Sequence, residues 1–375
     1  MRARYLFVNE NIAGHRTVHA NLARVLAGRA DVQVDFMNIP PATGLRRVAA
    51  ARIPLLDRQD ADFQPFRAQL LAADWVRRRV RHIARGYDAL HFYTHNAALL
   101  STTIMDAVPS VVSSDSTNVL NATRIHGREP ATMTPAAAAA GRAVEMPVYR
   151  HARKVMPSSQ WVARNLVHAY QVDPQRIVVN PMGIPLPALP EPVAKRPGER
   201  LRIGFIGNPF ARKGGELLLR EHRRRWCERA DLVVVTTSPL EQHSGVHVVN
   251  DITPGDVRLW DVLRSCDVFA FPSRIDQAPN AVLEAMAAWL PVVAYDAGAV
   301  GEMLDNGRAG VLAPDGDEKA FSDAVQQLLE DADARLRLGR SARHRVAAEY
   351  DMHRTADRLL DLLAEAAWQR PGLGP

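Results

Sequence analysis

The chain has 375 residues, of which 47% are hydrophobic and 23% are charged, and its formal net charge at pH 7 is +6. This length exceeds a single typical hydrophobic core and predicts two domains of similar size. No run of about 18 uncharged apolar residues occurs, which argues against a membrane-spanning helix. The two cysteines, Cys227 and Cys266, have neither the number nor the spacing of a disulfide framework or a metal site.

The first half of the chain alternates between short apolar strands and helices. Strands are predicted at residues 4–9, 32–37, 89–94, 111–117 and 153–158. Helices are predicted between them, notably over 17–28 and 66–85, and the alanine-rich run 136–140 is typical of a helix. Such alternation is typical of a parallel, doubly wound α/β sheet. We therefore predict a first α/β domain over residues 1–184.

Polar residues follow these strands at the edge where open α/β sheets bind ligands. Gly14 comes after the first strand, where a glycine allows close backbone approach to a ligand. His15 and Arg16 beside it are candidate acceptor or phosphate contacts and equally plausible surface residues. His95 lies just past the third strand. His91 lies inside that strand, where a histidine is more often a packing residue.

A proline-rich segment separates the two halves of the chain. Residues 185–200 contain five prolines, and we predict an interdomain linker there. Further strands are predicted near Ile203, at 232–236 and 246–249, and near Val268 and Val292. They predict a second α/β domain over 201–352, followed by a C-terminal segment, 353–375, with an amphipathic helix over 355–368.

Glycines and basic residues follow the first strand of the second half. Gly207 is followed by the run Arg212-Lys213-Gly214-Gly215 at the start of a predicted helix. Glycines let backbone N–H groups approach an anion at a helix N-terminus, and the two cations add charge. An ordinary basic turn has the same composition. The position between a strand and a helix favours binding of a diphosphate.

Two carboxylates eight residues apart follow a later strand. Asp276 lies in the loop after the strand predicted at 267–273, and Glu284 lies about one turn into the helix predicted over 280–290. A carboxylate accepts two hydrogen bonds from a vicinal diol, so the pair is suited to the ribose and the hexose of a nucleotide sugar. An acidic residue on a helix is often only solvated, but the place of Glu284 near the strand end favours a function.

The segment 276–294 resembles the E-x7-E region of the retaining glycosyltransferases of family 4, which have the GT-B fold. The resemblance continues over 297–314, with a glycine-rich turn, a glutamate and a D-x-G-x-x-G-x-L-x-P stretch, and upstream over 201–215. It implies two Rossmann-like doubly wound α/β domains that face each other across a cleft, with segment 353–375 crossing back to the first domain. It also implies metal-independent, retaining transfer of a hexose from a nucleoside diphosphate sugar to an unidentified acceptor, without a cofactor.

The same resemblance implies roles for individual residues. The first domain would bind the acceptor and the second the nucleotide sugar. The implied catalytic residues are His95, Arg212, Lys213 and Asp276, with the two cations stabilising the departing diphosphate. The implied donor contacts are Gly14, Gly207, Asn208, Lys213, Asp276, Ala278, Pro279, Asn280, Ala281, Val282 and Glu284. Asp115 and Thr117 resemble an acceptor-side D-x-T segment, which His15 and Arg16 would join.

Two positions depart from the family's pattern. Asp276 stands where the family usually has Glu, and because Asp is one methylene shorter, the contact with the sugar and the choice of donor are both in question. Asn208 stands where many members carry Arg, which leaves Arg212 and Lys213 as the phosphate cations.

Two other functions are compatible with this scaffold. A nucleotide-sugar epimerase would need acid and base carboxylates in the first domain, which we expect to be poor in Asp and Glu near its strand ends. A nucleotide-sugar-binding protein without turnover is suggested only by Asp276. The pairs Asp60/Asp62 and Asp315/Asp317 lie in a polar loop and a turn, so we expect no metal site at either.

The positive charge is concentrated in the first half. Residues 1–190 carry a balance of +10 and residues 191–375 a balance of −4. Arginines cluster at 46–47, at 77–81 with Arg85, and around 150–154. A basic helix of this kind either contacts anionic lipid headgroups or is an ordinary solvated helix. No nucleic-acid-binding module is present. We expect a cytoplasmic protein, with residues 77–85 as a possible peripheral membrane contact.

Overall fold

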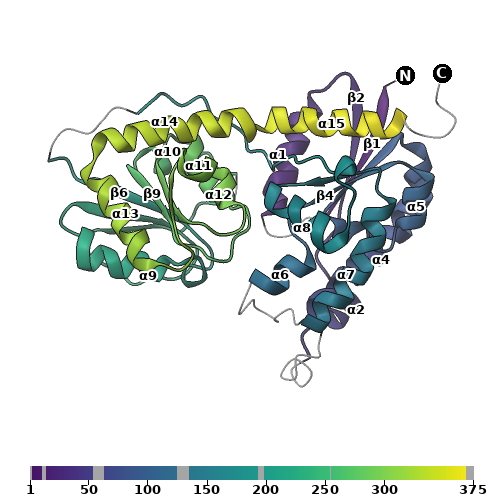
Figure 1. Cartoon of the computed structure of the whole chain (residues 1–375), viewed down its shortest axis with the longest axis horizontal. Coiled ribbons are helices and arrows are strands. Elements are labelled where there is room, and N and C mark those ends of the chain that lie inside the picture. The colour runs from purple at the N-terminus through teal and green to yellow at the C-terminus, as the bar shows by residue number, and fades with distance from the viewer. Residues whose placement is uncertain are drawn as a thin grey trace. The chain divides into compact units, whose positions relative to one another are not determined.

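A computed structural model of the chain describes residues 2–10, 14–53, 63–124, 135–192, 198–253 and 255–368 (Figure 1). The chain forms two compact units, one from residues 1–182 with 352–375 and one from residues 183–351. Each unit contains one parallel sheet with helices packed against it. This confirms the predicted α/β fold with two doubly wound domains.

The first unit is built on a five-stranded sheet in the order β2-β1-β3-β4-β5. Every pairing is parallel, and Tyr5 of β1 stands opposite Val34 of β2 and Ala89 of β3. The strands are β1 (Ala3–Asn9), β2 (Val32–Asn38), β3 (Ala89–Tyr93), β4 (Ser110–Ser114) and β5 (Lys154–Pro157). The helices are α1 (His15–Ala27), α2 (Gly44–Ala49), α4 (Gln64–Ile83), α5 (Thr102–Ala107), α6 (Asn118–Arg124), α7 (Pro135–His151), α8 (Gln160–Tyr170) and α15 (Met352–Trp368).

Side chains on these strands alternate between two buried faces, as a period of two requires. Leu6 and Val8 of β1 pack in a core with residues of α4, α7 and α8. Tyr5 and Phe7, one residue out of phase, pack with α1 and α15 on the other face. The last helix, α15, contributes Leu359, Leu360 and Leu363 among others to this second core, so it completes the first unit although it comes last in the sequence.

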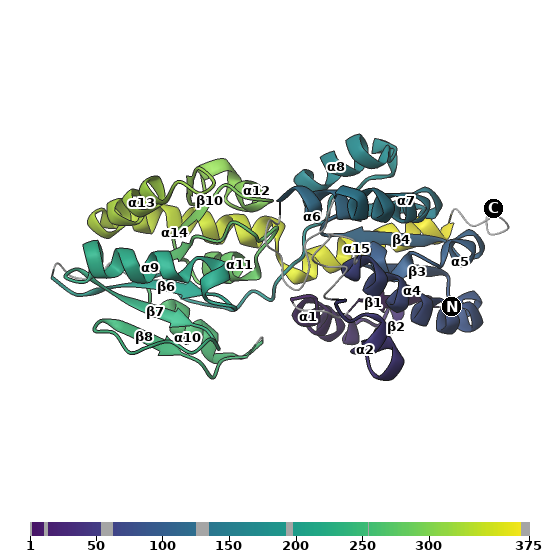
Figure 2. The same ribbon diagram turned by 90° about the horizontal axis from the view of Figure 1, so that it is seen from below.

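The second unit is built on a six-stranded parallel sheet in the order β11-β10-β9-β6-β7-β8, with β6, β7 and β8 side by side in Figure 2. The strands are β6 (Leu201–Ile206), β7 (Ala230–Val235), β8 (Val246–Val249), β9 (Val268–Phe271), β10 (Val292–Tyr295) and β11 (Val311–Ala313). The helices are α9 (Gly215–Glu221), α10 (Arg258–Arg264), α11 (Asn280–Ala287), α12 (Val300–Met303), α13 (Glu318–Glu330) and α14 (Ala332–Glu349), with a π-helical turn at His222–Trp226. The predicted strands are present, and β11 is an additional one.

The proline-rich residues expected to link the domains pack on the second unit. The indole Nε1 of Trp289 donates a hydrogen bond to the carbonyl of Leu189 at 3.3 Å. The guanidinium of Arg343 donates to the carbonyl of Pro187 at 3.0 Å. The second unit accordingly begins at Gly183, ahead of the predicted start at 201.

Candidate functional site

Both sheets have a point where the strand order reverses, and ligands of open α/β sheets bind just beyond the carboxyl ends of the strands at such points. In the second unit this point lies between β6 and β9, which are neighbours in the sheet although α9, β7, β8 and α10 come between them in the sequence. The loops that follow these two strands are 207–214 and 272–279. They contain the run with Lys213 and the segment with Asp276.

Glycines bring these two loops into contact. Gly214 has φ +83°, and a Cβ there would lie 2.4 Å from the carbonyl oxygen of Pro272. A Cβ on Gly207 would lie 2.5 Å from a ring carbon of Phe205 and 2.8 Å from the Cβ of Lys213, within the first loop. A larger side chain at Gly214 would push the two loops apart, and one at Gly207 would displace Lys213 within its own loop, so both glycines are required by close approach.

Lys213 and Asp276 meet at this junction. The ammonium Nζ of Lys213 forms an ion pair with the Asp276 carboxylate, and the hydroxyl of Ser273 donates a hydrogen bond to the other carboxylate oxygen. The two charged side chains are 16% and 17% exposed, so the pair is partly accessible to solvent. Arg212 is exposed and makes no hydrogen bond or ion pair with the described residues, so its guanidinium is available to an anion.

Glu284 lies in α11, which begins directly after this loop. Burial raises the pKa of its carboxyl group from 4.5 to about 7. Within the described parts of the chain, no side chain forms a hydrogen bond or an ion pair with that carboxylate. The side-chain oxygen of Asn280, at the start of the same helix, is buried without a hydrogen-bond partner among the described residues. An unsatisfied buried polar group is costly, so this oxygen indicates a missing partner near the start of α11.

The loop before α11 is held in place by backbone contacts with the turn after β10. The carbonyl of Gln277 accepts a hydrogen bond from the Ala299 amide at 2.7 Å. Gly298 has φ +60°, and a Cβ there would lie 2.7 Å from the same carbonyl oxygen. This turn therefore fixes the position of Asp276 through backbone contacts that the Asp276–Glu284 spacing does not reveal.

The other predicted donor contacts of the second unit have more ordinary surroundings. Val282 is fully buried, and Ala278 and Ala281 pack against the same core, so their side chains serve packing. Pro279 is buried ahead of the first turn of α11. The amide oxygen of Asn208 accepts hydrogen bonds from Thr236 and Thr237 at the end of β7, which anchors the 207–214 loop.

In the first unit the strand order reverses between β1 and β3, and an ion pair lies near this edge. His15, the first residue of α1, places Nε2 2.9 Å from a carboxylate oxygen of Asp115, which follows β4. Burial disfavours both charges, but their mutual attraction is stronger. The pKa of His15 is raised, and the pKa of Asp115 is lowered to about 2. Arg16 and Gly14 beside this pair are exposed.

His95 is buried past the end of β3, and both of its ring nitrogens face protein groups. Nε2 lies 2.7 Å from the carboxylate of Glu145 in α7, and Nδ1 lies 3.3 Å from the hydroxyl of Ser114. Burial lowers the pKa of His95, but Glu145 outweighs it and the net shift is upward. His91 is buried inside β3, 2.7 Å from the Ser113 hydroxyl, as a packing histidine would be. The catalytic role of His95 stays a prediction.

Thr117, predicted on the acceptor side, is fully buried. Its hydroxyl accepts a hydrogen bond from the Leu120 amide and donates one to Asn165, so it holds the start of α6. Asp115, two residues earlier, keeps part of its side chain exposed. Of the two residues, only Asp115 presents its polar group to solvent.

We expect Asp115→Asn to reverse the direction in which the pKa of His15 is shifted. Without the Asp115 carboxylate, burial outweighs the weaker attraction of Glu10 for the charged imidazole, so the His15 pKa should fall below the ordinary value of about 6.5, whereas that of the wild type lies above it. The pair's contribution to stability is present below pH 6.5 and is lost as the pH rises through the raised pKa of His15. NMR titration of the His15 ring measures both proteins. An unchanged His15 pKa in the variant would contradict the ion pair.

The first unit has more acidic residues near its strand ends than expected from sequence. Glu10 follows β1, is buried, and accepts a hydrogen bond from the Thr94 hydroxyl at 2.6 Å. Glu145 is completely buried behind His95 and also accepts hydrogen bonds from the Tyr170 hydroxyl and the Asn118 amide. The expectation that this edge is poor in carboxylates was therefore wrong. Glu145 comes from the middle of a helix far along the chain, so no local pattern indicated it.

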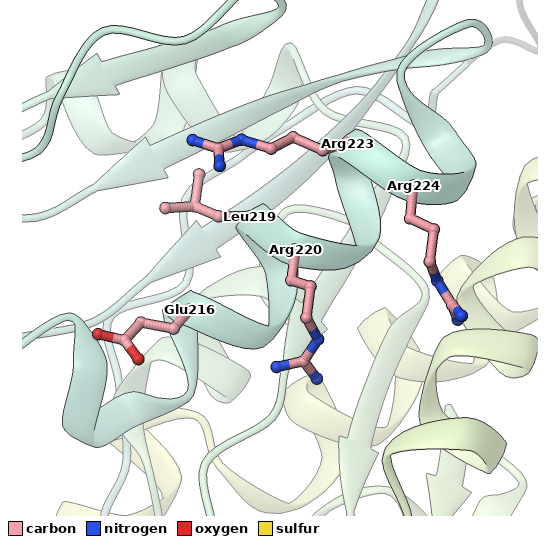
Figure 3. A pocket seen from close by; sticks show the side chains of 5 residues that line it. All are labelled: Glu216, Leu219, Arg220, Arg223 and Arg224. Atoms are coloured by element: carbon pink, nitrogen blue, oxygen red, sulfur yellow. The ribbon is translucent and has the colours of Figure 1, made fainter.

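A separate hollow of about 460 Å³ lies along α9 and the π-helical turn that follows it (Figure 3). It is lined by Glu216, Leu219, Arg220, Arg223 and Arg224. Each arginine already has a partner: Arg220 pairs with Glu318, Arg224 with Glu221, and Arg223 lies 2.6 Å from a ring nitrogen of His243. We assign no binding role to this hollow.

No group of three or more potential metal ligands occurs among the described residues. Asp315 pairs with Arg274, and Asp317 accepts a hydrogen bond from the Ala320 amide at the start of α13, so both have structural roles. Asp60 and Asp62 lie outside the described residues. Within the described ranges, no helix is both long and apolar enough to cross a lipid bilayer.

Comparison with known proteins points to one family. Residues 200–331 match the family model of glycosyl transferases group 1. A D-inositol 3-phosphate glycosyltransferase of Nocardia farcinica is 28% identical over 371 residues, which cover 89% of this chain and 79% of the relative. An alpha-D-kanosaminyltransferase of Streptomyces kanamyceticus is 29% identical over 99 residues, which cover 26% of each chain.

Solved structures show the same fold. Sucrose-phosphate synthase from Thermosynechococcus elongatus superimposes with a TM-score of 0.72 at 18% identity, covering 97% of this chain and 99% of that one. HepE of Anabaena, solved in complex with UDP-glucose, gives a TM-score of 0.64 at 15% identity, covering 96% and 99%. The sheets, the loops after β6 and β9, and these relatives agree: the chain is a glycosyltransferase with the GT-B fold, and its residues 200–331 match the glycosyl transferases group 1 family.

Proposed function

We propose that the protein transfers a hexose from a nucleoside diphosphate sugar to an acceptor hydroxyl with retention of the anomeric configuration. The observation that supports this most directly is the ion pair of Lys213 and Asp276 near the strand-order reversal of the second unit, with Glu284 on the helix that begins just after Asp276. It combines an accessible cation with two carboxylates, the groups that a diphosphate and two sugar diols require. The binding of UDP-glucose by HepE supports a donor of this class.

Each group has a distinct role in this proposal. Lys213 and Arg212 stabilise the negative charge that grows on the diphosphate as it departs, helped by the amides of Gly214 and Gly215. Asp276, held by Ser273 and Lys213, accepts hydrogen bonds from the hexose. Glu284, whose carboxylate has no side-chain partner among the described residues, and Asn280, whose side-chain oxygen is buried without one there, contact the ribose.

The reaction needs no protein nucleophile. The bond between the anomeric carbon and the diphosphate oxygen breaks, and a bond to the acceptor oxygen forms on the same face. The acceptor's proton moves to the departing phosphate oxygen, so the products are a glycoside and a nucleoside diphosphate. We assign the acceptor to the first unit, where His15 and Asp115 present a charged pair near the edge of the sheet.

A donor screen followed by product analysis tests this proposal. We expect at least one nucleoside diphosphate sugar to raise the melting temperature, because a ligand that binds only the folded state stabilises it. With that donor and a panel of acceptors, NMR of the product should show the anomeric configuration of the donor. An inverted product would contradict the mechanism. An isomerised sugar without transfer would indicate an epimerase, and binding without any product would indicate a binding protein.

A further inference from the structure

Helix α2 (Gly44–Ala49) exposes its large apolar side chains. Leu45 is 88% exposed and Val48 is 72% exposed. Residues three apart lie on the same side of a helix, so the two form one apolar strip. Ile53, five residues further on, is 41% exposed. Single exposed apolar residues are common, but neighbouring ones on one short helix indicate a contact surface.

The same helix carries positive charge beside the apolar strip. Arg46 and Arg47 lie between Leu45 and Val48, and residues 36–56 contain three arginines and no acidic residue. The side chains of Arg46 and Arg47 form no hydrogen bond or ion pair with any residue in the described ranges, although the Nε atom of Arg46 is itself buried. The surface therefore combines exposed apolar side chains with cations that no described carboxylate neutralises.

Hydrogen bonds from side chains of α4 fix the position of α2. The side-chain amide of Gln64 donates a hydrogen bond to the carbonyl of Ala50 at 2.9 Å. The guanidinium of Arg67 donates to the carbonyls of Ala49 and Ala51, which lie at the C-terminal end of α2. These bonds hold the helix by its backbone and leave the side chains of Leu45 and Val48 in solvent.

The arginines of α4 itself are less suited to the same role. Arg77 and Arg78 both pair with Asp74, at 2.6 and 2.7 Å, and the guanidinium of Arg79 lies 3.9 Å from the ring centre of Trp75. These arginine side chains already contact other residues of α4, so they are less available to bind lipid phosphates. At 1.5 Å per residue, Arg78 lies about 20 Å along α4 from Gln64, so the two surfaces can be tested separately.

We propose that α2 is a docking surface for a lipid bilayer with anionic headgroups. Leu45 and Val48 enter the interface between headgroups and acyl chains, and Arg46 and Arg47 bind the lipid phosphates. With only two apolar side chains and two cations, the binding is weak and reversible and falls with salt. This inference goes beyond the proposed function, because the groups that hold the donor lie in the other unit.

Vesicle co-sedimentation of the full chain tests the proposal, with phosphatidylcholine vesicles that contain or lack 30% phosphatidylglycerol, roughly the anionic fraction that gives strong surface potentials. The variants are Leu45→Ser with Val48→Ser, and Arg46→Gln with Arg47→Gln. Val257→Ser is the matched apolar control, since Val257 is 76% exposed in the second unit. Arg78→Gln with Arg81→Gln is the matched charge control on α4.

At low salt we expect the wild type to bind the anionic vesicles and not the neutral ones. Each α2 variant should bind roughly tenfold more weakly, on the scale of losing two interfacial residues, and both controls should bind like the wild type. Melting temperature checks that every variant folds. The proposal is overturned if the wild type does not bind, if the α2 variants bind normally, or if the α4 control loses binding. It is also overturned if light scattering shows that Leu45 and Val48 join two copies of the chain.

Discussion

Lys213→Ala should lower the turnover rate by on the order of a hundredfold or more, as removal of a preorganised charge partner of the transition state does. The ammonium of Lys213 lies where the loops after β6 and β9 meet. If it acts chiefly on the departing diphosphate, donor affinity should change less than the rate does. Steady-state kinetics and direct donor titration measure the two effects separately.

Two further variants make the Lys213 result specific. Lys319→Ala removes an exposed lysine that pairs with Asp323 in the same unit, and we expect it to leave turnover unchanged. Lys213→Arg should restore little, because a planar guanidinium does not place its charge where a compact ammonium did. Normal turnover in Lys213→Ala would mean that the run Arg212-Lys213-Gly214-Gly215 is only a solvated turn with no role in stabilising the diphosphate.

Glu284→Gln should weaken donor binding by roughly 1.5–3 kcal/mol, the scale of a hydrogen bond to a charged group. The substitution keeps the size of the side chain and removes its charge, so a loss of affinity reports on the hydrogen bonds that the carboxylate accepts. Glu330→Gln is the matched control, because Glu330 pairs with Arg229 on the surface of the same unit. Unchanged binding in Glu284→Gln would remove Glu284 from the site.

The same variant should be more stable than the wild type at alkaline pH. The pKa of Glu284 is raised by burial from 4.5 to about 7, so the folded state binds its proton more tightly than the unfolded state does. The wild type therefore loses stability as the pH rises from 4.5 to 7, by on the order of 2–3 kcal/mol. Glu284→Gln should not lose this stability, because the glutamine side chain does not titrate. Melting curves at pH 4.5 and pH 8 should agree at the lower pH and differ at the higher one.

The sequence was informative where function depends on local spacing. The strand that ends at Phe271, the loop with Asp276 and the helix that begins at Asn280 all lie within 20 residues, so one pattern predicted their arrangement. Hydrophobic alternation predicted the parallel sheets for the same reason. The resemblance to family 4 glycosyltransferases then led to the assignment that the comparisons confirm.

Contacts between distant segments could not be predicted in this way. The partner of His95 is Glu145, fifty residues later and in the middle of a helix, and the partner of His15 is Asp115, one hundred residues later. Gly298 supports the Asp276 loop through a backbone contact that no side-chain pattern encodes. The exposure of Leu45 and Val48 also required the structure, because the pattern of a six-residue helix does not reveal which face is buried.

Hydrogen–deuterium exchange of the whole chain, with and without a nucleoside diphosphate that binds it, tests the central claim most directly. Bound ligand slows exchange where it orders the backbone, whether or not turnover occurs. We predict protection in peptides that cover residues 207–215 and 276–284, because these loops carry Lys213, Asp276 and Glu284. Protection confined to other segments, with these two unchanged, would contradict the assignment of the donor site to the junction after β6 and β9.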